Sequence, residues 1–176
     1  MSEIWYEEVP ASQRIGQGDI FPNMHIYSVV PQIITDIDPT PNVNHFESPV
    51  IILTQACDLE NEPVAESVVC AILLPVKGQS WSFVSNVLSG KKPALHIIDE
   101  YHSAAVNFAY HIVDFSDLYT VQYSVLNQVR ELFPYRLRLK SPYLEYASQR
   151  FGNYFSRIGL PKGIEQNRIK TFVQEE

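Results

Sequence analysis

The chain has 176 residues, of which 45% are hydrophobic and 12% aromatic, and its formal net charge is −7. This length and composition predict one folded domain with a sizeable core and exclude a largely disordered chain. The sequence contains no apolar run near the ~20 residues that cross a bilayer, and its N-terminus lacks the pattern of a signal peptide. We therefore expect a cytosolic protein with no membrane contact, in which Cys57 and Cys70 are thiols.

The charge is unevenly distributed along the chain. Residues 1–129 hold 4 Lys or Arg against 15 Asp or Glu, whereas residues 130–176 hold 9 against 5. Two interpretations follow for the basic C-terminal quarter. It either packs on the acidic body of the same domain or forms a surface for a phosphate backbone or an acidic partner.

The first half of the chain shows short apolar segments punctuated by prolines, a pattern typical of many short strands. It predicts a turn entering a strand over residues 16–21, then strands over 24–30 and 32–37. Residues 38–49 are expected to form a long loop, because Pro39, Pro41 and Pro49 cannot donate hydrogen bonds in a central ladder.

Two continuous apolar runs, residues 49–56 and 67–76, predict central strands that are buried on both faces. The acidic stretch between them, residues 58–66, is expected to be a solvated loop. Residues 81–88 then predict a short helix that ends before Gly90.

The second half of the chain alternates between strand and helix patterns. Period-two alternation predicts strands over residues 107–115 and 135–140, with a short helix over 122–132 between them. A longer helix is expected from about Pro142 to Ile158, with Ser141 as its N-cap. Its apolar stripe consists of Leu144, Ala147, Phe151, Tyr154, Phe155 and Ile158. Gly152 in this helix predicts a close approach by another backbone.

The segment TQACDLEN follows an apolar strand without a spacer, which predicts a group of polar side chains at one end of the sheet. In one interpretation, Gln55, Cys57 and Asp58 are a fold signature in which Asp58 accepts hydrogen bonds from the following backbone amides. In the other, Cys57 is a nucleophile. The candidate bases are His45, His96, His102 and His111, and the candidate orienting carboxylates are Asp58 and Asp99. Neither a CxxC pair nor a His spacing typical of metal ligands is present, so no metal or cofactor is predicted.

The basic C-terminal quarter supplies a candidate binding surface. Arg136, Arg138 and Lys140 fall on one face of the strand predicted over residues 135–140. Arg150 and Arg157 lie on the polar side of the last helix. A row of cations can track phosphates, and it can equally pair with acidic strands of its own domain.

Parts of the chain resemble known bacterial proteins. The segments TQACDLEN and RFGNYFSRIGLP resemble a group of small bacterial proteins without an assigned function. The order QGDIF, long loop, PVIILTQ, CAILLPVK and SNVLSG, over about residues 16–90, is similar to the PemK/MazF toxins. That resemblance implies an SH3-like barrel of an RNA-cleaving family. The Arg that precedes the strand-opening Pro in that family is Ser48 here, so the resemblance extends to the barrel and not to the reaction.

These observations predict an α+β, mainly β fold: a small bent sheet or SH3-like barrel that carries a C-terminal helix. We expect a single domain over residues 1–176, made of a β-rich body (16–122), a strand plus helix (135–160) and a tail (161–176). The favoured function is a non-enzymatic binding or adaptor subunit of a bacterial cytosolic assembly, in a toxin- or defence-related setting. It implies a protein partner, with nucleic acid as an alternative. The alternative functions are a PemK/MazF-like endoribonuclease, or an inactive relative of one, and a cysteine-dependent hydrolase centred on Cys57.

Overall fold

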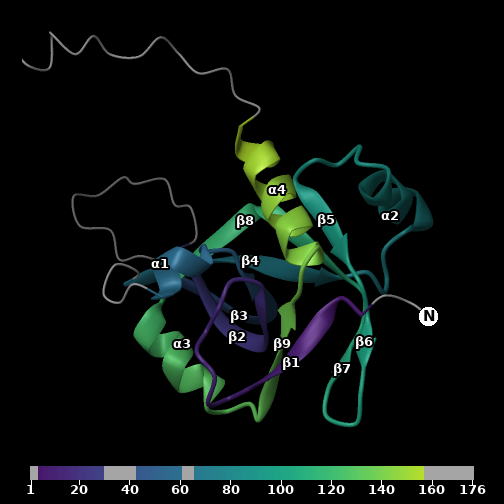
Figure 1. Ribbon diagram of the computed structural model, residues 1–176. Helices are drawn as coiled ribbons and strands as arrows, with labels where there is room; N and C mark the ends of the chain where they lie inside the picture. The colour runs from purple at the N-terminus through teal and green to yellow at the C-terminus, as the bar shows by residue number, and fades with distance from the viewer. Residues whose placement is uncertain (1–3, 30–42, 61–65, 157–176) are drawn as a thin grey trace, which may run out of the picture.

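The computed structural model describes residues 4–29, 43–60 and 66–156, and its main feature is a seven-stranded antiparallel sheet (Figure 1). The strand order is β1-β9-β2-β3-β4-β8-β5, and β6 and β7 form a separate two-stranded sheet. The strands are β1 (Tyr6–Pro10), β2 (Asp19–Val29), β3 (Val43–Ile52), β4 (Ser67–Pro75), β5 (Leu95–Ile98), β6 (Tyr101–His102), β7 (Asn107–Phe108), β8 (His111–Gln122) and β9 (Tyr135–Leu139). The helices are α1 (Ala56–Glu60), α2 (Trp81–Leu88), α3 (Tyr123–Arg130) and α4 (Tyr143–Phe155).

The predicted mainly β fold with a C-terminal helix is confirmed, and the sheet is open and does not close into a barrel. Its two edge strands are β1 and β5. The Tyr6 side chain spans the gap between these edges, because its hydroxyl donates to the Asp99 carbonyl, 2.7 Å away, just after β5 ends. The same ring packs edge-on against Tyr101 and Phe108 of the β6–β7 hairpin. The contact between the two edges is therefore made by side chains and not by the backbone pairing that would close a barrel.

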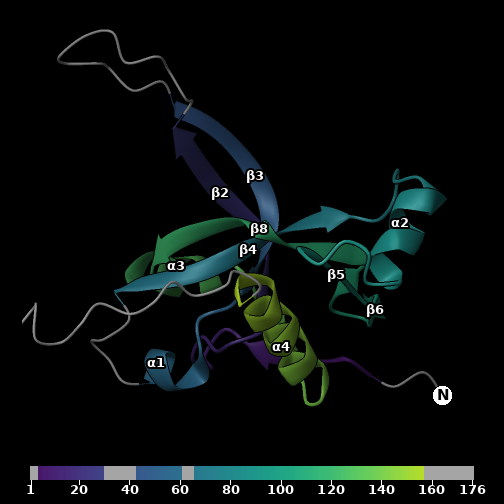
Figure 2. The same ribbon diagram turned by 90° about the horizontal axis from the view of Figure 1, so that it is seen from above.

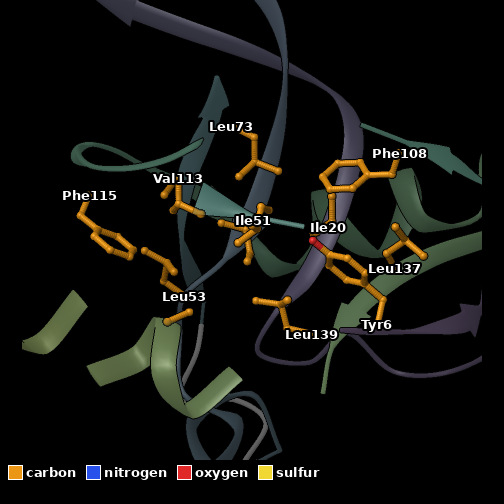
Figure 3. Close-up of a cluster of buried hydrophobic side chains, with 13 residues drawn as sticks. Tyr6, Ile20, Ile51, Leu53, Leu73, Phe108, Val113, Phe115, Leu137 and Leu139 are labelled. Atoms are coloured by element: carbon orange, nitrogen blue, oxygen red, sulfur yellow. The ribbon is translucent and has the colours of Figure 1, made fainter. Parts of the chain in front are cut away.

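Both faces of the central strands are buried, as their continuous apolar runs predict. Alternate residues point to opposite faces of a strand, so Ile51 belongs to one core while Val50 and Ile52 belong to the other. Helix α4 covers the first core through Ala147, and α3 covers the second through Leu126. Figure 3 shows the side chains of the first core around Ile51.

Strand β3 corrects the loop predicted over residues 38–49, since residues 43–49 belong to the strand. The register of β2 and β3 shifts between Phe21 and Met24, and Pro49 lies opposite this bulge. A bulge leaves a residue without a ladder partner, so a proline there interrupts no hydrogen bond. The strand predicted over 32–37, together with Pro39 and Pro41, lies outside the described residues.

Helices α2, α3 and α4 confirm the three helical predictions. The N-cap of α4 is Pro142 instead of Ser141, and no side chain caps this helix. A Cβ on Gly152 would meet nothing within 4 Å among the described residues, so the predicted close approach is wrong. The helix end predicted at Ile158 and the tail over 161–176 lie outside those residues.

The first part of the acidic stretch predicted as a loop is helical, because Asp58 and Glu60 belong to α1. Leu59 anchors this short helix, since its side chain is buried in the second core. None of the helices in the described part of the chain is long and apolar enough to span a membrane.

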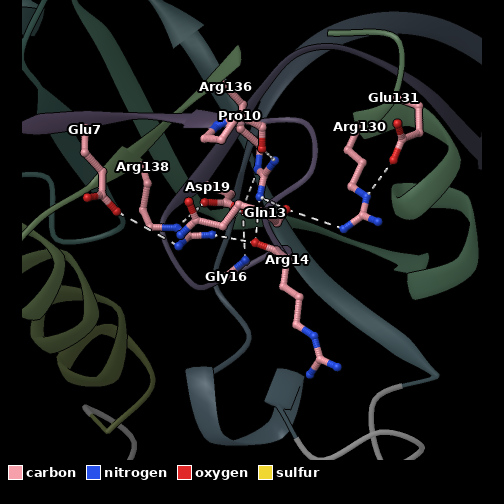
Figure 4. Close-up of polar contacts among 10 residues, drawn as sticks. All are labelled: Glu7, Pro10, Gln13, Arg14, Gly16, Asp19, Arg130, Glu131, Arg136 and Arg138. Carbon is pink, nitrogen blue, oxygen red and sulfur yellow. Dashed lines mark hydrogen bonds and ion pairs between the residues drawn. The ribbon is translucent and has the colours of Figure 1, made fainter. Parts of the chain in front are cut away.

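A buried ion cluster joins β1, β2, β9 and the loop between β1 and β2 (Figure 4). The side chain of Asp19 is 0% exposed, and its carboxylate accepts hydrogen bonds from Arg136 Nε at 2.7 Å and from Arg138 Nε at 2.5 Å. The Gly16 N–H donates to the same carboxylate at 2.9 Å. Arg136 also donates to the carbonyls of Pro10, Gln13 and Arg14. Charge-assisted bonds of this kind offset the cost of burying the charges.

We predict that Asp19→Ala lowers the free energy of unfolding by about 3–5 kcal/mol, because it leaves Arg136 buried without its carboxylate. Urea unfolding followed by circular dichroism measures the change. The control is Glu131→Ala, which removes the exposed ion pair with Arg130 and should cost at most about 1 kcal/mol. Equal stabilities of the two variants would contradict a structural role for the cluster.

Candidate functional site

The residues of TQACD lie where the chain leaves the sheet after β3. The Leu53 N–H donates to the Val69 carbonyl at 2.9 Å, and the Val69 N–H donates to Thr54 Oγ1 at 2.7 Å. These bonds extend the contact with β4 past the end of β3 and fix the direction of the chain. Gln55, Cys57 and Asp58 follow as exposed residues at the start of α1. The structure therefore brings the three predicted residues together at one margin of the sheet.

A groove runs between α1 and α4, and it has two parts that meet at Gln55. The first part has a volume of about 500 Å³ and is lined by Leu53, Thr54, Gln55, Asp58, Ser67, Val69 and Phe151. The second has a volume of about 430 Å³ and is lined by Gln17, Gln55, Ala56, Cys57, Leu144, Glu145 and Ser148. In the view of Figure 2 both helices lie below β4, although Leu59 of α1 belongs to the second core and Ala147 of α4 to the first. We call this feature the α1–α4 groove.

The polar side chains on the floor of the groove are mostly bonded to the protein itself. Gln17 Nε2 donates to the Leu53 carbonyl at 3.4 Å and to Ser148 Oγ at 3.1 Å. The Ser148 hydroxyl donates to the Leu144 carbonyl at 2.8 Å. These bonds tie α4 to the end of β3, so this part of the groove has a structural role.

The Cys57 thiol lies 3.8 Å from Gln55 Oε1 and 3.6 Å from Asp58 Oδ1. The backbone amides that follow Asp58 include those of residues 61–65, which lie outside the described residues, so its predicted role as their acceptor stays a prediction. Within α1, the Asp58 N–H donates to the Gln55 carbonyl at 3.1 Å. The three side chains thus form a small polar group whose members contact one another.

The four candidate histidine bases are held on other elements. His96 packs against Tyr146, His102 Nδ1 lies 2.6 Å from Asn107 Oδ1, and His111 donates to the Ala109 carbonyl. His45 stacks on His25, with ring centroids 5.1 Å apart, on the far part of β3. A thiol enzyme needs its base within hydrogen-bond reach of the nucleophile. The contacts of these histidines therefore do not support a Cys–His pair.

The predicted basic surface is largely used inside the protein. Arg136 is buried and Arg138 is half-buried, and both pair with Asp19. Burial lowers the pKa of the Arg138 guanidinium, but the hydrogen bond and charge of Asp19 and the charge of Glu7 outweigh burial and raise it. Neither arginine is therefore available as an exposed cation of the predicted row.

The other predicted cations are dispersed. Lys140 is exposed just after β9, and its backbone N–H donates to the Trp5 carbonyl. Arg150 is half-buried on α4, where Nη2 donates to the Leu95 carbonyl at 2.9 Å. Arg157 lies outside the described residues. The described members of the set thus do not form a continuous basic face.

The sequence reasoning missed a two-stranded arm formed by the outer halves of β2 and β3. β2 pairs with β9 only at Asp19 and Ile20, and β3 pairs with β4 only over residues 50–52. Beyond the bulge, the described residues of the two strands pair only with each other, and they project from the sheet (Figure 2). We call residues 24–29 and 43–48 the β2–β3 arm. The strand predicted over residues 24–30 matches its first strand as far as residue 29, but the prolines hid the second.

The two faces of the arm differ. On the inner face, Met24 and Ile26 are buried in the second core, and Phe46 contacts Tyr119 edge-on. On the outer face, Tyr27 is 64% exposed and stacks on His45, with ring centroids 4.8 Å apart. The arm is thus held on one side and presents stacked aromatic rings on the other.

No group of three or more His, Cys, Asp or Glu side chains that could hold a metal ion occurs within the described ranges. Comparison with known proteins finds neither a matching family model nor a matching curated protein.

The different exposure of the two cysteines can be tested directly. Cys57 is exposed, whereas Cys70 is buried and its burial raises the pKa of the thiol to about 12. Because the thiolate is the reactive form, we predict that one equivalent of a thiol reagent reacts with the native chain near neutral pH, at Cys57. A second equivalent should react only after denaturation. Peptide mapping identifies the modified residue, and modification of Cys70 in the native chain would contradict the described core.

Proposed function

We propose that this chain is a non-enzymatic binding subunit, an adaptor, of a bacterial cytosolic assembly. We further propose that the outer face of the β2–β3 arm is its main contact with a protein partner. The observation that carries this proposal is the projection of the arm with exposed aromatic side chains on one face.

A two-stranded ribbon has open backbone edges on both sides, and such edges are ready to pair with another strand. An isolated two-stranded ribbon is also only marginally stable in water. A partner that covers the arm would therefore stabilise both of its strands. Large side chains are exposed on the outer face of the arm, namely Tyr27 and Val43. Aromatic residues such as Tyr and Phe are enriched in protein interfaces.

The alternative of RNA cleavage receives less support from the geometry. Metal-independent cleavage requires a cation or donor array for the charge that develops on the phosphate. The two strand arginines best placed for a phosphate are paired with Asp19 instead. The remaining body is acidic, which disfavours the approach of a polyanion.

The adaptor proposal predicts that changing the outer face of the arm reduces partner binding without unfolding the chain. The variant is Tyr27→Ser with Val43→Ser, and the matched control is Tyr135→Ser, an exposed tyrosine on β9. Tagged chains are purified from the source cytosol, and co-purified proteins are quantified by mass spectrometry. We expect the arm variant to retain at least tenfold less of a stoichiometric partner than the control.

Two outcomes would contradict this proposal. If the wild-type chain retains no stoichiometric protein, the adaptor function is wrong. If the arm variant and the control retain the same partner equally, the arm is not the contact surface. Circular dichroism of each variant establishes that the fold is intact.

The same proposal predicts that the purified chain does not cleave RNA. A mixed single-stranded RNA is incubated with the chain, with and without a divalent metal ion, and the products are separated by size. Defined products that disappear in Cys57→Ala or Asp58→Ala would replace the adaptor proposal with a ribonuclease.

A further inference from the structure

The outer face of the β2–β3 arm holds two histidines whose ring nitrogens face each other. His25 lies on β2 and His45 lies on β3, in diagonal positions, since the direct cross-strand partner of His45 is Tyr27. His25 Nδ1 lies 2.8 Å from His45 Nε2. Both residues are exposed, and the side chain of His25 is 58% exposed. Two imidazole nitrogens are thus held close together on a surface that solvent reaches.

Two neutral imidazoles at this distance can share a hydrogen bond, and the same two nitrogens can instead bind one metal ion. Imidazole is a preferred ligand of Zn²⁺, Cu²⁺ and Ni²⁺. With metal–nitrogen bonds of about 2.0 Å, two nitrogens at a right angle on one ion lie about 2.8 Å apart, and at a tetrahedral angle about 3.3 Å apart. The observed separation of 2.8 Å matches the right-angled arrangement, which is typical of Cu²⁺ and Ni²⁺.

The charge around the two histidines favours a cation. Glu47 is the direct cross-strand partner of His25, and its Oε1 lies 3.5 Å from His25 Nδ1. Asn23 Nδ2 donates to the other carboxylate oxygen at 2.8 Å, which holds this carboxylate in place. The sequence of the arm, residues 24–29 and 43–48, contains neither Lys nor Arg. A metal ion at the two nitrogens would therefore lie beside a negative charge, with no lysine or arginine of the arm to oppose it.

The fold positions both ligands before an ion arrives. The backbone pairing of β2 with β3 fixes the separation of the two histidines, and Tyr27 stacks on His45 with the ring planes 23° apart. The nitrogens now face each other, so the rings must turn until both lone pairs point at one ion. Because both side chains are exposed, this turn takes place at the surface. The ring that now donates the hydrogen must also move it to its other nitrogen, which is a change of tautomer.

We propose that His25 and His45 form a bidentate site for a divalent transition-metal ion, with Cu²⁺ and Ni²⁺ bound more tightly than Zn²⁺. His25 Nδ1 and His45 Nε2 bind the ion, Glu47 lies beside it, and water fills the remaining positions. The bound ion joins β2 to β3 in the part of the arm where their described residues pair only with each other. It therefore stabilises a ribbon that would be only marginally stable by itself. This inference does not rest on the adaptor function, because the isolated chain binds the ion.

The test is a calorimetric titration of the isolated chain with Ni²⁺ at neutral pH. The chain carries no polyhistidine tag, and Cys57→Ser removes an exposed thiol that also binds transition metals. We expect one Ni²⁺ per chain at saturation. Zn²⁺ should bind more weakly at the same site, and Mg²⁺, which prefers oxygen ligands, should not displace either ion.

Single variants separate a bidentate site from a contact with any exposed histidine. His25→Gln and His45→Gln should each weaken Ni²⁺ binding at least tenfold, because either variant leaves only one imidazole. The matched control is His102→Gln. His102 is also exposed and also lies beside a carboxylate, 3.2 Å from Glu100, so its loss should leave binding unchanged.

A second measurement needs no histidine variant. Zn²⁺ is added to the Cys57→Ser chain, and the histidine ring signals are followed by NMR. We expect saturable shifts of the His25 and His45 signals, while those of His102 and His111 stay in place.

Three results would overturn the inference. The absence of saturable Ni²⁺ binding would indicate that the two histidines only share a hydrogen bond. Weakening by only one of the two variants would indicate a single-histidine contact. Equal weakening by His102→Gln, or equal Zn²⁺ shifts of all exposed histidines, would indicate a general effect of the surface.

Discussion

The buried carboxylate of Asp19 is the constraint on which the arrangement of the sheet depends. Its two partners, Arg136 and Arg138, lie on β9, far from β2 in the sequence. A buried charge is tolerated only when its partners are in place, so β9 must lie next to β2 when Asp19 is buried. β9 is hydrogen-bonded to β1 on its other side. One ion cluster thus couples the N-terminal strand to the last strand of the chain.

The cluster also accounts for two of the nine cations in the basic C-terminal quarter. Alternation correctly placed Arg136 and Arg138 on one face of a strand, and the possibility that they pair within the domain was open. The sequence could not identify Asp19 as the partner, because that depends on β9 lying between β1 and β2. The order of strands depends on contacts between distant segments of the chain, whereas alternation can be read within one short segment. Complementary charge in distant segments can therefore signal internal pairing as readily as an external partner.

Local patterns predicted most of the fold and part of the candidate site. The helices α2, α3 and α4 follow from periodicity and end signals, and β4 follows from its continuous apolar run. Strand β3 was partly missed, because a bulge in its neighbour makes Pro49 acceptable there. Gln55, Cys57 and Asp58 were found because they are adjacent in the sequence. The effect of the Arg150 charge on the buried imidazole of His96 was not, because the two residues come near each other only through the packing of α4 on β5.

The proposed binding features lie where strands lose their neighbours. The arm begins where β3 extends past its pairing with β4, so its backbone edges are open. At the other end of the sheet, β5 is an edge strand, and its Leu95 carbonyl is bonded by Arg150 and not by another strand. In the central strands, the ladder and two cores satisfy both the backbone and the side chains. Polar groups that a partner or ligand could still satisfy therefore remain at the margins of the sheet, and the sheet itself serves as a rigid support for them.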